Sequence, residues 1–92
     1  MKVGSESLLE ECQTLQNFLV DYSTGGRDAD FDYEAVRRKL NANESIRHLI
    51  PEFVRTCRTI GQFWGFIKAK FPTYAERRTY LWGEFQPLLE GL

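Results

Sequence analysis

Apolar residues recur at steps of three and four along most of the chain, which is the spacing of one face of an α-helix. The clearest stripe lies within residues 5–22 and consists of Leu8, Leu9, Cys12, Leu15, Phe18, Leu19 and Tyr22. Ser5 or Ser7 can cap the start of this helix. Gly25 and Gly26 predict its end, because glycine adopts left-handed backbone readily. The pattern therefore predicts one long helix followed by a loop.

The remainder of the chain predicts four or five shorter helices. They are expected from Asp30 or Asp32 to about Leu40, over 44–50, from Pro51 onward, from Thr59 to Phe71, and from Thr73 to about Leu89. Thr59 and Thr73 each stand three residues before a glutamine or a glutamate, Gln62 and Glu76, which is the spacing of a reciprocal N-terminal cap. Pro72 separates the last two helices, because the residue before a proline avoids helical geometry.

Two other prolines bear on the helix boundaries. Pro51 is expected to open a short helix, because its missing N–H costs nothing in a first helical turn. Pro87 falls inside the last predicted helix, where its ring would collide with the carbonyl of Gly83. Two outcomes stay open there. Either the helix is kinked between 83 and 87, or it ends at Gln86.

No segment alternates with a period of two, so strands are not expected. A chain of 92 residues is long enough for a single domain, here residues 1–92. The fold class expected is all-α, a compact antiparallel bundle of five to six short helices.

Aromatic residues are numerous, with seven Phe, four Tyr and two Trp. Most of them keep helical register with the apolar stripes, and stripes of this kind usually form a core. The two stripes expected inside are Phe63, Trp64, Ile67 and Phe71, and then Tyr74, Leu81, Phe85 and Leu88. Phe66 and Trp82 lie off these stripes and are the best candidates for partial exposure. The aromatic residues therefore predict a packed interior and do not indicate a ligand.

Residue types that carry catalysis are sparse. The single histidine, His48, and two cysteines 45 positions apart do not have metal-ligand spacing. Cys12 and Cys57 lie among apolar residues and are expected to be buried, reduced thiols. A Cys57–His48 nucleophilic pair is formally available, but a buried thiol is unreactive. The segment "GGRDAD" lacks the lysine of a phosphate loop. We therefore expect that the chain is not an enzyme and that it uses no cofactor.

Charge is divided along the chain. Residues 1–34 hold eight acids and two bases, a net of −6, whereas residues 35–80 hold ten bases and three acids, a net of +7. Residues 81–92 add −2, which gives the total of −1. One interpretation is that these charges decorate solvated helix faces and that acids favour helix starts. The other is that the acidic part of one copy meets the basic part of another, a head-to-tail contact that repeats into rings or filaments.

The second interpretation names candidate residues for the two faces. The basic face would comprise Arg37, Arg38, Arg77 and Arg78. The acidic face would comprise Asp28, Asp30, Asp32 and Glu34. Arginine suits such a contact because its planar fork can bind a carboxylate with two hydrogen bonds. For Arg78, an internal ion pair with Glu76 or Glu52 is an equal alternative.

The segments "PEFVR", "FWGFIK" and "YAERR…F.PLL", within residues 49–92, resemble small helical modules appended to effectors in bacterial antiphage defence systems. Those modules are similar to the death-fold superfamily, in particular its caspase-recruitment (CARD-like) branch. The resemblance implies a death-fold-like bundle and homotypic assembly with like domains. It also implies that assembly brings attached effectors, such as proteases or nucleases, together in bacterial immunity.

The favoured prediction is therefore a protein–protein interaction or adaptor module. One alternative is nucleic-acid binding through a helix at 59–71 or 73–86, although the chain has no net basic charge. Another is an inert domain that docks within its own parent chain. The sequence shows no membrane span and no signal peptide, so a cytoplasmic location is expected. Whether the chain is a whole small adaptor or a module of a longer protein stays open.

Overall fold

The computed structural model describes the backbone of residues 3–26 and 32–91, and the side chains of 8–26 and 32–91. These residues form five α-helices and one 3-10 helix, with no strand in the described ranges. The elements are α1 (Val3–Ser23), α2 (Tyr33–Asn41), η1 (Arg47–Leu49), α3 (Glu52–Thr56), α4 (Ile60–Lys70) and α5 (Tyr74–Gly91). The all-α prediction is confirmed.

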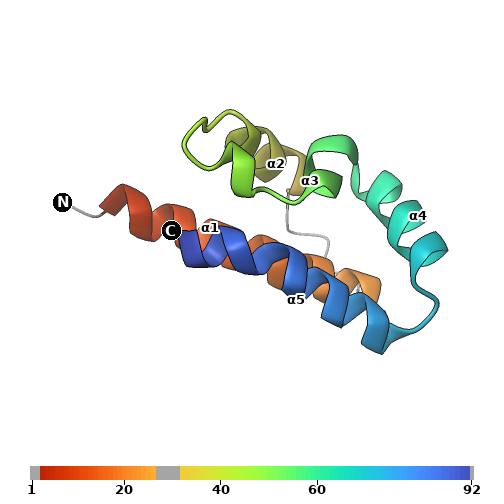
Figure 1. Cartoon of the computed structure of the whole chain (residues 1–92). Helices are drawn as coiled ribbons and strands as arrows, with labels where there is room; N and C mark the ends of the chain where they lie inside the picture. The colour runs from red at the N-terminus through yellow and green to blue at the C-terminus, as the bar shows by residue number, and fades with distance from the viewer. Residues whose placement is uncertain (1–2, 27–31, 92) are drawn as a thin grey trace.

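The two long helices form one layer of the molecule. Figure 1 shows α1 and α5 side by side and running in opposite directions, so that the two termini lie near the same end. The α1–α5 contact is the most extensive between any two elements. The shorter elements α2, η1, α3 and α4 form a second layer above this pair. The radius of gyration is 12.8 Å, near the value of about 12 Å expected for a globular chain of this length. The helices thus form a compact bundle.

The N-terminal caps predicted at Thr59 and Thr73 form, whereas the prediction of a cap at Ser5 or Ser7 is wrong, because α1 already begins at Val3. The Thr59 hydroxyl accepts a hydrogen bond from the Gln62 N–H at 3.2 Å, and the Gln62 side chain accepts one in return from the Arg58 N–H at 2.7 Å. At α5, the Thr73 hydroxyl accepts from the Glu76 N–H at 3.2 Å and donates to the Glu76 carboxylate at 2.8 Å. Three of these four bonds satisfy backbone N–H groups that have no partner inside the helix, and the fourth joins the Thr73 and Glu76 side chains. The sequence therefore located both helix starts.

The start of α2 and the end of α1 also follow local chemistry. Asp32 is the N-cap of α2, and its carboxylate accepts from the Ala35 N–H at 3.0 Å. Of the two predicted starts, Asp32 is the one that the structure uses. Gly25, just after α1, has a φ of +107°, a conformation that residues with a side chain rarely adopt. Glycine at this position lets the chain leave the helix without strain.

The segment 44–50 differs from the prediction of a short α-helix. It forms turns followed by the 3-10 helix η1. Ile50 has an extended ψ of 132°, because the proline that follows it disfavours helical geometry. The Asn43 side chain also accepts from the Ser45 N–H at 3.0 Å, which closes a local turn. Too few residues remain between these two constraints for an α-helix.

At Pro87 the structure excludes one of the two alternatives. The helix α5 does not end at Gln86 but continues through Pro87 to Gly91. Both Pro87 and Gly83 lie on the exposed side of α5. The Gly83 carbonyl, which loses its partner to the proline, therefore faces water that can replace the missing hydrogen bond.

The core joins the two layers. Its buried apolar side chains are Cys12, Leu15, Leu19, Tyr33, Leu40, Ile46, Ile50, Phe53, Val54, Cys57, Phe63, Ile67, Leu81, Phe85 and Leu88. The prediction of partial exposure is confirmed for both residues: half of the Trp82 surface is accessible, and Phe66 is partly buried. The prediction that Tyr74 is a core residue is wrong, since its side chain is 51% exposed. Tyr74 is the first residue of α5, beyond the part of that helix that the core covers.

Candidate interaction surfaces

Arg77 does not lie on a surface. Its side chain is only 6% exposed. The guanidinium donates from Nε to the Phe71 carbonyl at 2.8 Å and from Nη1 to the Ser23 carbonyl at 2.9 Å. It also lies over the rings of Trp64 and Tyr74, 5.4 and 5.5 Å from their centroids. Arg77 therefore joins the ends of α1 and α4 to the start of α5, and it is not available to the basic face.

The other predicted arginines are divided between the two layers. Arg38 is exposed on α2, whereas Arg37 is partly buried and donates from Nη2 to the Arg55 carbonyl at 2.6 Å. Arg78 is partly buried on α5, in the other layer. Among the described side chains, Lys39 and Glu11 form an ion pair, with 2.7 Å between the ammonium nitrogen and a carboxylate oxygen. The alternative ion pair of Arg78 with Glu76 or Glu52 does not form within 4.0 Å among these side chains. The two arginine pairs do not form a single face.

The predicted acidic face is described in part. Asp28 and Asp30 lie outside the described residues. Asp32 and Glu34 are exposed at the start of α2, the same helix that carries Arg37 and Arg38. Acids at the start and bases at the end of one helix both interact favourably with its dipole. This part of the charge division is local to α2, as the first interpretation expects.

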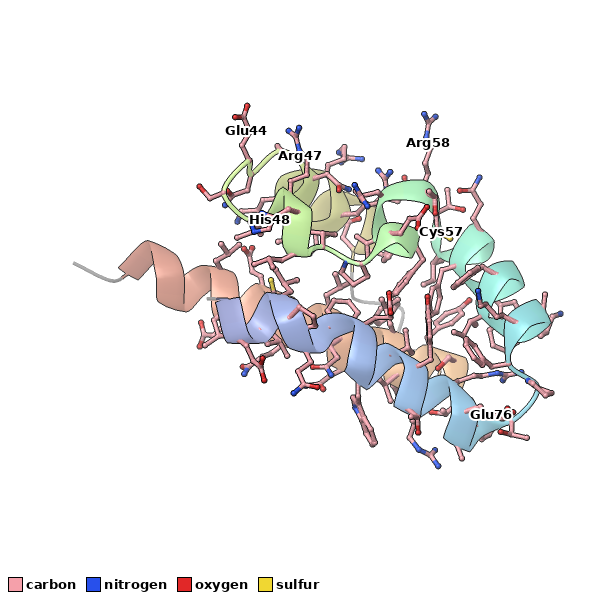
Figure 2. The ribbon with its side chains drawn as sticks, in the orientation of Figure 1. Glu44, Arg47, His48, Cys57, Arg58 and Glu76 are labelled. Carbon is pink, nitrogen blue, oxygen red and sulfur yellow. The ribbon has the colours of Figure 1, made fainter. Side chains whose placement is uncertain are left out.

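A wider charge division runs between the layers. Five exposed cations lie within residues 38–58, which we call the basic segment, and they are Arg38, Lys39, Arg47, Arg55 and Arg58. The same segment holds two acids, Glu44 and Glu52. Figure 2 shows Arg47 and Arg58 projecting from the second layer, away from α1 and α5. Helix α1, by contrast, contains four acids and no base. Cations thus predominate in the basic segment and acids on α1, although Lys39 of the basic segment is paired with Glu11 of α1.

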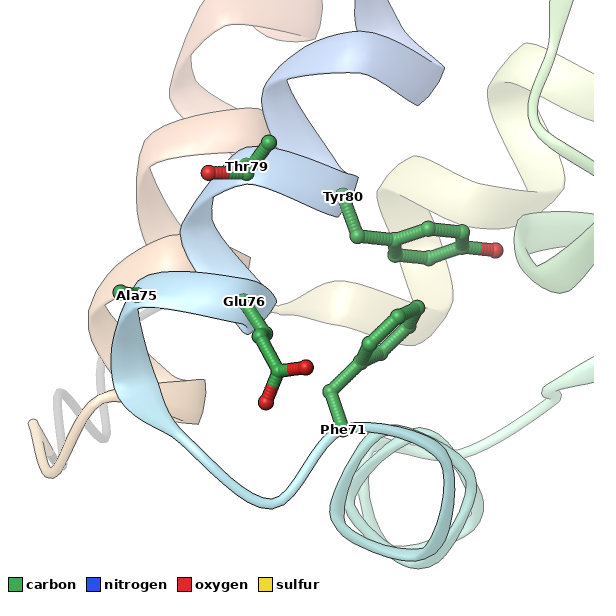
Figure 3. Close-up of a pocket in the computed structure, with 5 residues that line it drawn as sticks. All are labelled: Phe71, Ala75, Glu76, Thr79 and Tyr80. Carbon is green, nitrogen blue, oxygen red and sulfur yellow. The ribbon is translucent and has the colours of Figure 1, made fainter.

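An apolar groove opens where α4 passes into α5. It has a volume of about 420 Å³ and is lined by Phe71, Ala75, Glu76, Thr79 and Tyr80 (Figure 3). A second hollow of about 270 Å³ shares Tyr80 with it and is lined by Glu52, Phe53, Thr56, Phe66, Lys70 and Tyr80. We call the two together the Tyr80 groove. The sequence does not indicate this groove, because Tyr80 lies beside the α5 stripe and a groove depends on how α3, α4 and α5 meet.

Tyr80 is the centre of an aromatic cluster in this groove. Its ring centroid lies 4.6 Å from that of Phe71, 6.0 Å from that of Phe53 and 6.1 Å from that of Phe66. Burial, together with the negative charges of Glu84 and Glu52, raises the pKa of Tyr80 to about 12. The phenol is therefore protonated at neutral pH, and the carboxylates nearby make the groove attractive to a cation.

The two cysteines have the expected environment. Both are free and buried, and the prediction that they are buried is confirmed. Burial, with the charge of Glu11 beside it, raises the pKa of Cys12 to about 11. Burial also raises the pKa of Cys57, although a hydrogen bond from Thr56 and the charge of Arg37 oppose it. His48 is exposed on η1 and so does not share the interior with Cys57.

Two further results concern the described residues as a whole. They contain no group of three or more His, Cys, Asp or Glu side chains that could hold a metal ion. They also contain no helix with both the length and the apolar character needed to cross a membrane.

Comparisons with protein families, with curated proteins and with solved structures find no match to this chain. The class that the structure defines is therefore an all-helical bundle, and any assignment beyond that class is a proposal.

Proposed function

We propose that this chain is a non-enzymatic interaction module that assembles with like domains through oppositely charged surfaces. The observation that carries the proposal is the charge division between the layers. The basic segment presents five exposed cations on one layer, while α1 on the other layer holds acids alone. Charges arranged in this way steer two copies into one relative orientation and disfavour others.

The position of the charges favours a heterologous contact. Arg47 and Arg58 project away from the α1–α5 layer. A copy stacked on that side would bring its own α1–α5 layer toward these arginines. Each added copy would present a new basic segment at the far side, so the contact can repeat.

The further proposal is that such assembly clusters an attached effector, such as a protease or a nuclease, in bacterial antiphage immunity. Its support is the resemblance of residues 49–92 to death-fold-like (CARD-like) modules. The segments that carry the resemblance fall on α3, α4 and α5 of an all-helical bundle. A cytoplasmic location is part of the same proposal.

Light scattering after size-exclusion chromatography tests the assembly. The average mass should rise with protein concentration and fall as salt is added, because added salt shortens the range of charge interactions to about 10 Å at 0.1 M. The double variant Arg38→Glu, Arg58→Glu should weaken the association, whereas the matched variant Arg38→Lys, Arg58→Lys should retain most of it. A monomer under every condition would refute spontaneous assembly.

Nucleic-acid binding is a second candidate, and the basic segment is the observation that favours it. Five exposed cations against two acids could contact phosphates. Anisotropy of a short labelled RNA or DNA would show binding that weakens steeply with salt. Binding without self-association would favour this candidate over the interaction module.

A further inference from the structure

We propose that the Tyr80 groove is the acceptor for the basic segment of a second copy of this chain, with Arg47 and Arg58 as the residues that enter or border it. This inference rests on the proposed function, because it names the surface that the basic segment meets. Three features support this assignment: the walls of the groove, its charge, and the way the chain binds an arginine of its own.

The walls of the groove suit a long side chain with a flat, charged end. Phe71 and Tyr80 supply aromatic surface, and Ala75 and Thr79 add small side chains to the lining. The volume of about 420 Å³ falls within the range of roughly 300 to 1,000 Å³ for ligand pockets. An arginine can pack its methylene groups on such a surface and place its guanidinium over a ring.

The charge at the groove favours a cation. Glu76 lines the first hollow, and Glu52 lines the second. Glu84 and Glu52 both act on the Tyr80 hydroxyl. The base among the lining residues is Lys70, whose ammonium lies 5.7 Å from the centre of the Phe66 ring. Two lining carboxylates against one lining ammonium leave a net negative charge, which complements the basic segment.

Arg77 of the same chain shows how an aromatic surface binds an arginine. The guanidinium of Arg77 lies over two aromatic rings, those of Trp64 and Tyr74, and donates to backbone carbonyls. The Tyr80 groove repeats the aromatic part of this arrangement and adds carboxylates, but its lining residues include no arginine. An arginine from outside the chain would complete it.

A second copy is the occupant that the charge distribution favours. The same chain supplies both Glu76 in the first hollow and the exposed Arg47 and Arg58, and these lie on different sides of the molecule. The second hollow adjoins the basic segment, since Glu52, Phe53 and Thr56 belong to that segment. In Figure 2, Arg47 and Arg58 project from the second layer, whereas Glu76 lies at the start of α5 on the opposite side. One copy therefore does not bring these arginines to Glu76 of its own groove, whereas a second copy can.

Matched variants on one helix face test the groove. Thr79→Arg places a positive charge in the groove, and Gln86→Arg places the same residue seven positions later on the exposed side of α5. Seven residues are close to two helical turns, so both positions point the same way. We expect Thr79→Arg to raise the dissociation constant of self-association by about tenfold or more, because it sets like charge against the incoming arginines. Gln86→Arg should change it by less than about threefold.

A mixing experiment then tests the pairing itself. The Thr79→Arg copy has a blocked groove and an intact basic segment, and the Arg47→Glu, Arg58→Glu copy has the reverse. Each alone should be largely monomeric, and an equimolar mixture should form a dimer of one copy of each. Circular dichroism and a thermal melt would first establish that every variant is folded.

The outcomes separate this inference from the proposed function. If the wild-type chain stays monomeric at all concentrations, the proposed function and the inference both fail. If the wild type associates and Thr79→Arg associates equally well, the groove is not the acceptor, while assembly by charge stands. Equal loss in Thr79→Arg and Gln86→Arg, or no dimer in the mixture, would also overturn the inference.

Discussion

The Nη1 group of Arg77 lies 2.9 Å from the backbone carbonyl of Ser23, a residue 54 positions earlier in the chain. The same guanidinium donates through Nε to the Phe71 carbonyl. One buried side chain thus satisfies a carbonyl in the last turn of α1 and another at the end of α4. Its positive charge is also favourable near the negative end of the α1 dipole. This charge acts within the fold, not at an interface.

Replacing Arg77 by alanine should therefore destabilise the domain strongly. The change leaves two carbonyls without their donor and removes the packing between Trp64 and Tyr74. We expect the free energy of unfolding to fall by about 2 to 4 kcal/mol. Urea denaturation followed by circular dichroism measures it. Arg38→Ala, at an exposed position, should cost less than about 0.5 kcal/mol. Equal losses in the two variants would contradict the structural role of Arg77.

Two glycines should respond to alanine in opposite directions. A Cβ at Gly83 would meet no atom within 4 Å, and this residue lies inside α5. Gly83→Ala should therefore raise the stability by about 0.5 to 1 kcal/mol through its better helix propensity. Gly25 has a φ of +107°, so Gly25→Ala should lower the free energy of unfolding by about 1 kcal/mol or more. Thermal melts of both variants check this. A stabilising Gly25→Ala would contradict the left-handed turn after α1.

The contribution of the Thr73 cap to the stability of the domain can be measured against a conservative variant. Thr73→Ala removes the hydroxyl that accepts from the Glu76 N–H and donates to its carboxylate. A loss of about 1 kcal/mol is expected. Thr73→Ser keeps the hydroxyl and should recover most of that stability. If the serine and alanine variants unfold at the same denaturant concentration, the capping bonds do not contribute.

Stability should fall at alkaline pH because of Cys12. Its pKa rises from an ordinary value of 9.0 to about 11 in the folded state, chiefly through burial. The folded state then holds its proton more tightly than the unfolded state, so the contribution is complete below about pH 9 and is lost as the pH rises toward 11. Denaturation curves from pH 8 to 11 should show the decline. In Cys12→Ala the decline should be smaller, and an unchanged slope would refute the assignment.

The same burial predicts slow thiol chemistry. A thiol reagent at pH 8 should modify neither Cys12 nor Cys57 rapidly in the folded protein, and should modify both at once when denaturant is added. Rapid labelling of the native protein would mean that the interior opens more readily than the packing indicates.

The sequence by itself determined the helices and most of their boundaries. Helical periodicity located the apolar stripes, and the caps at Thr59, Thr73 and Asp32 depend on residues three positions apart. Such signals are local, so they can be recognised without knowing the fold. The segment 44–50 and the exposure of Tyr74 were predicted wrongly, because both depend on where a short element ends relative to its neighbours.

The tertiary structure alone decided which of the arginines is buried and where a groove forms. Arg77 and Arg78 are adjacent in sequence, yet only Arg77 is buried, because one residue of α5 points toward the end of α1 and the next does not. The Tyr80 groove likewise exists only where α3, α4 and α5 meet. Burial and grooves arise from contacts between residues far apart in the chain, and the periodicity of a single helix does not specify those contacts.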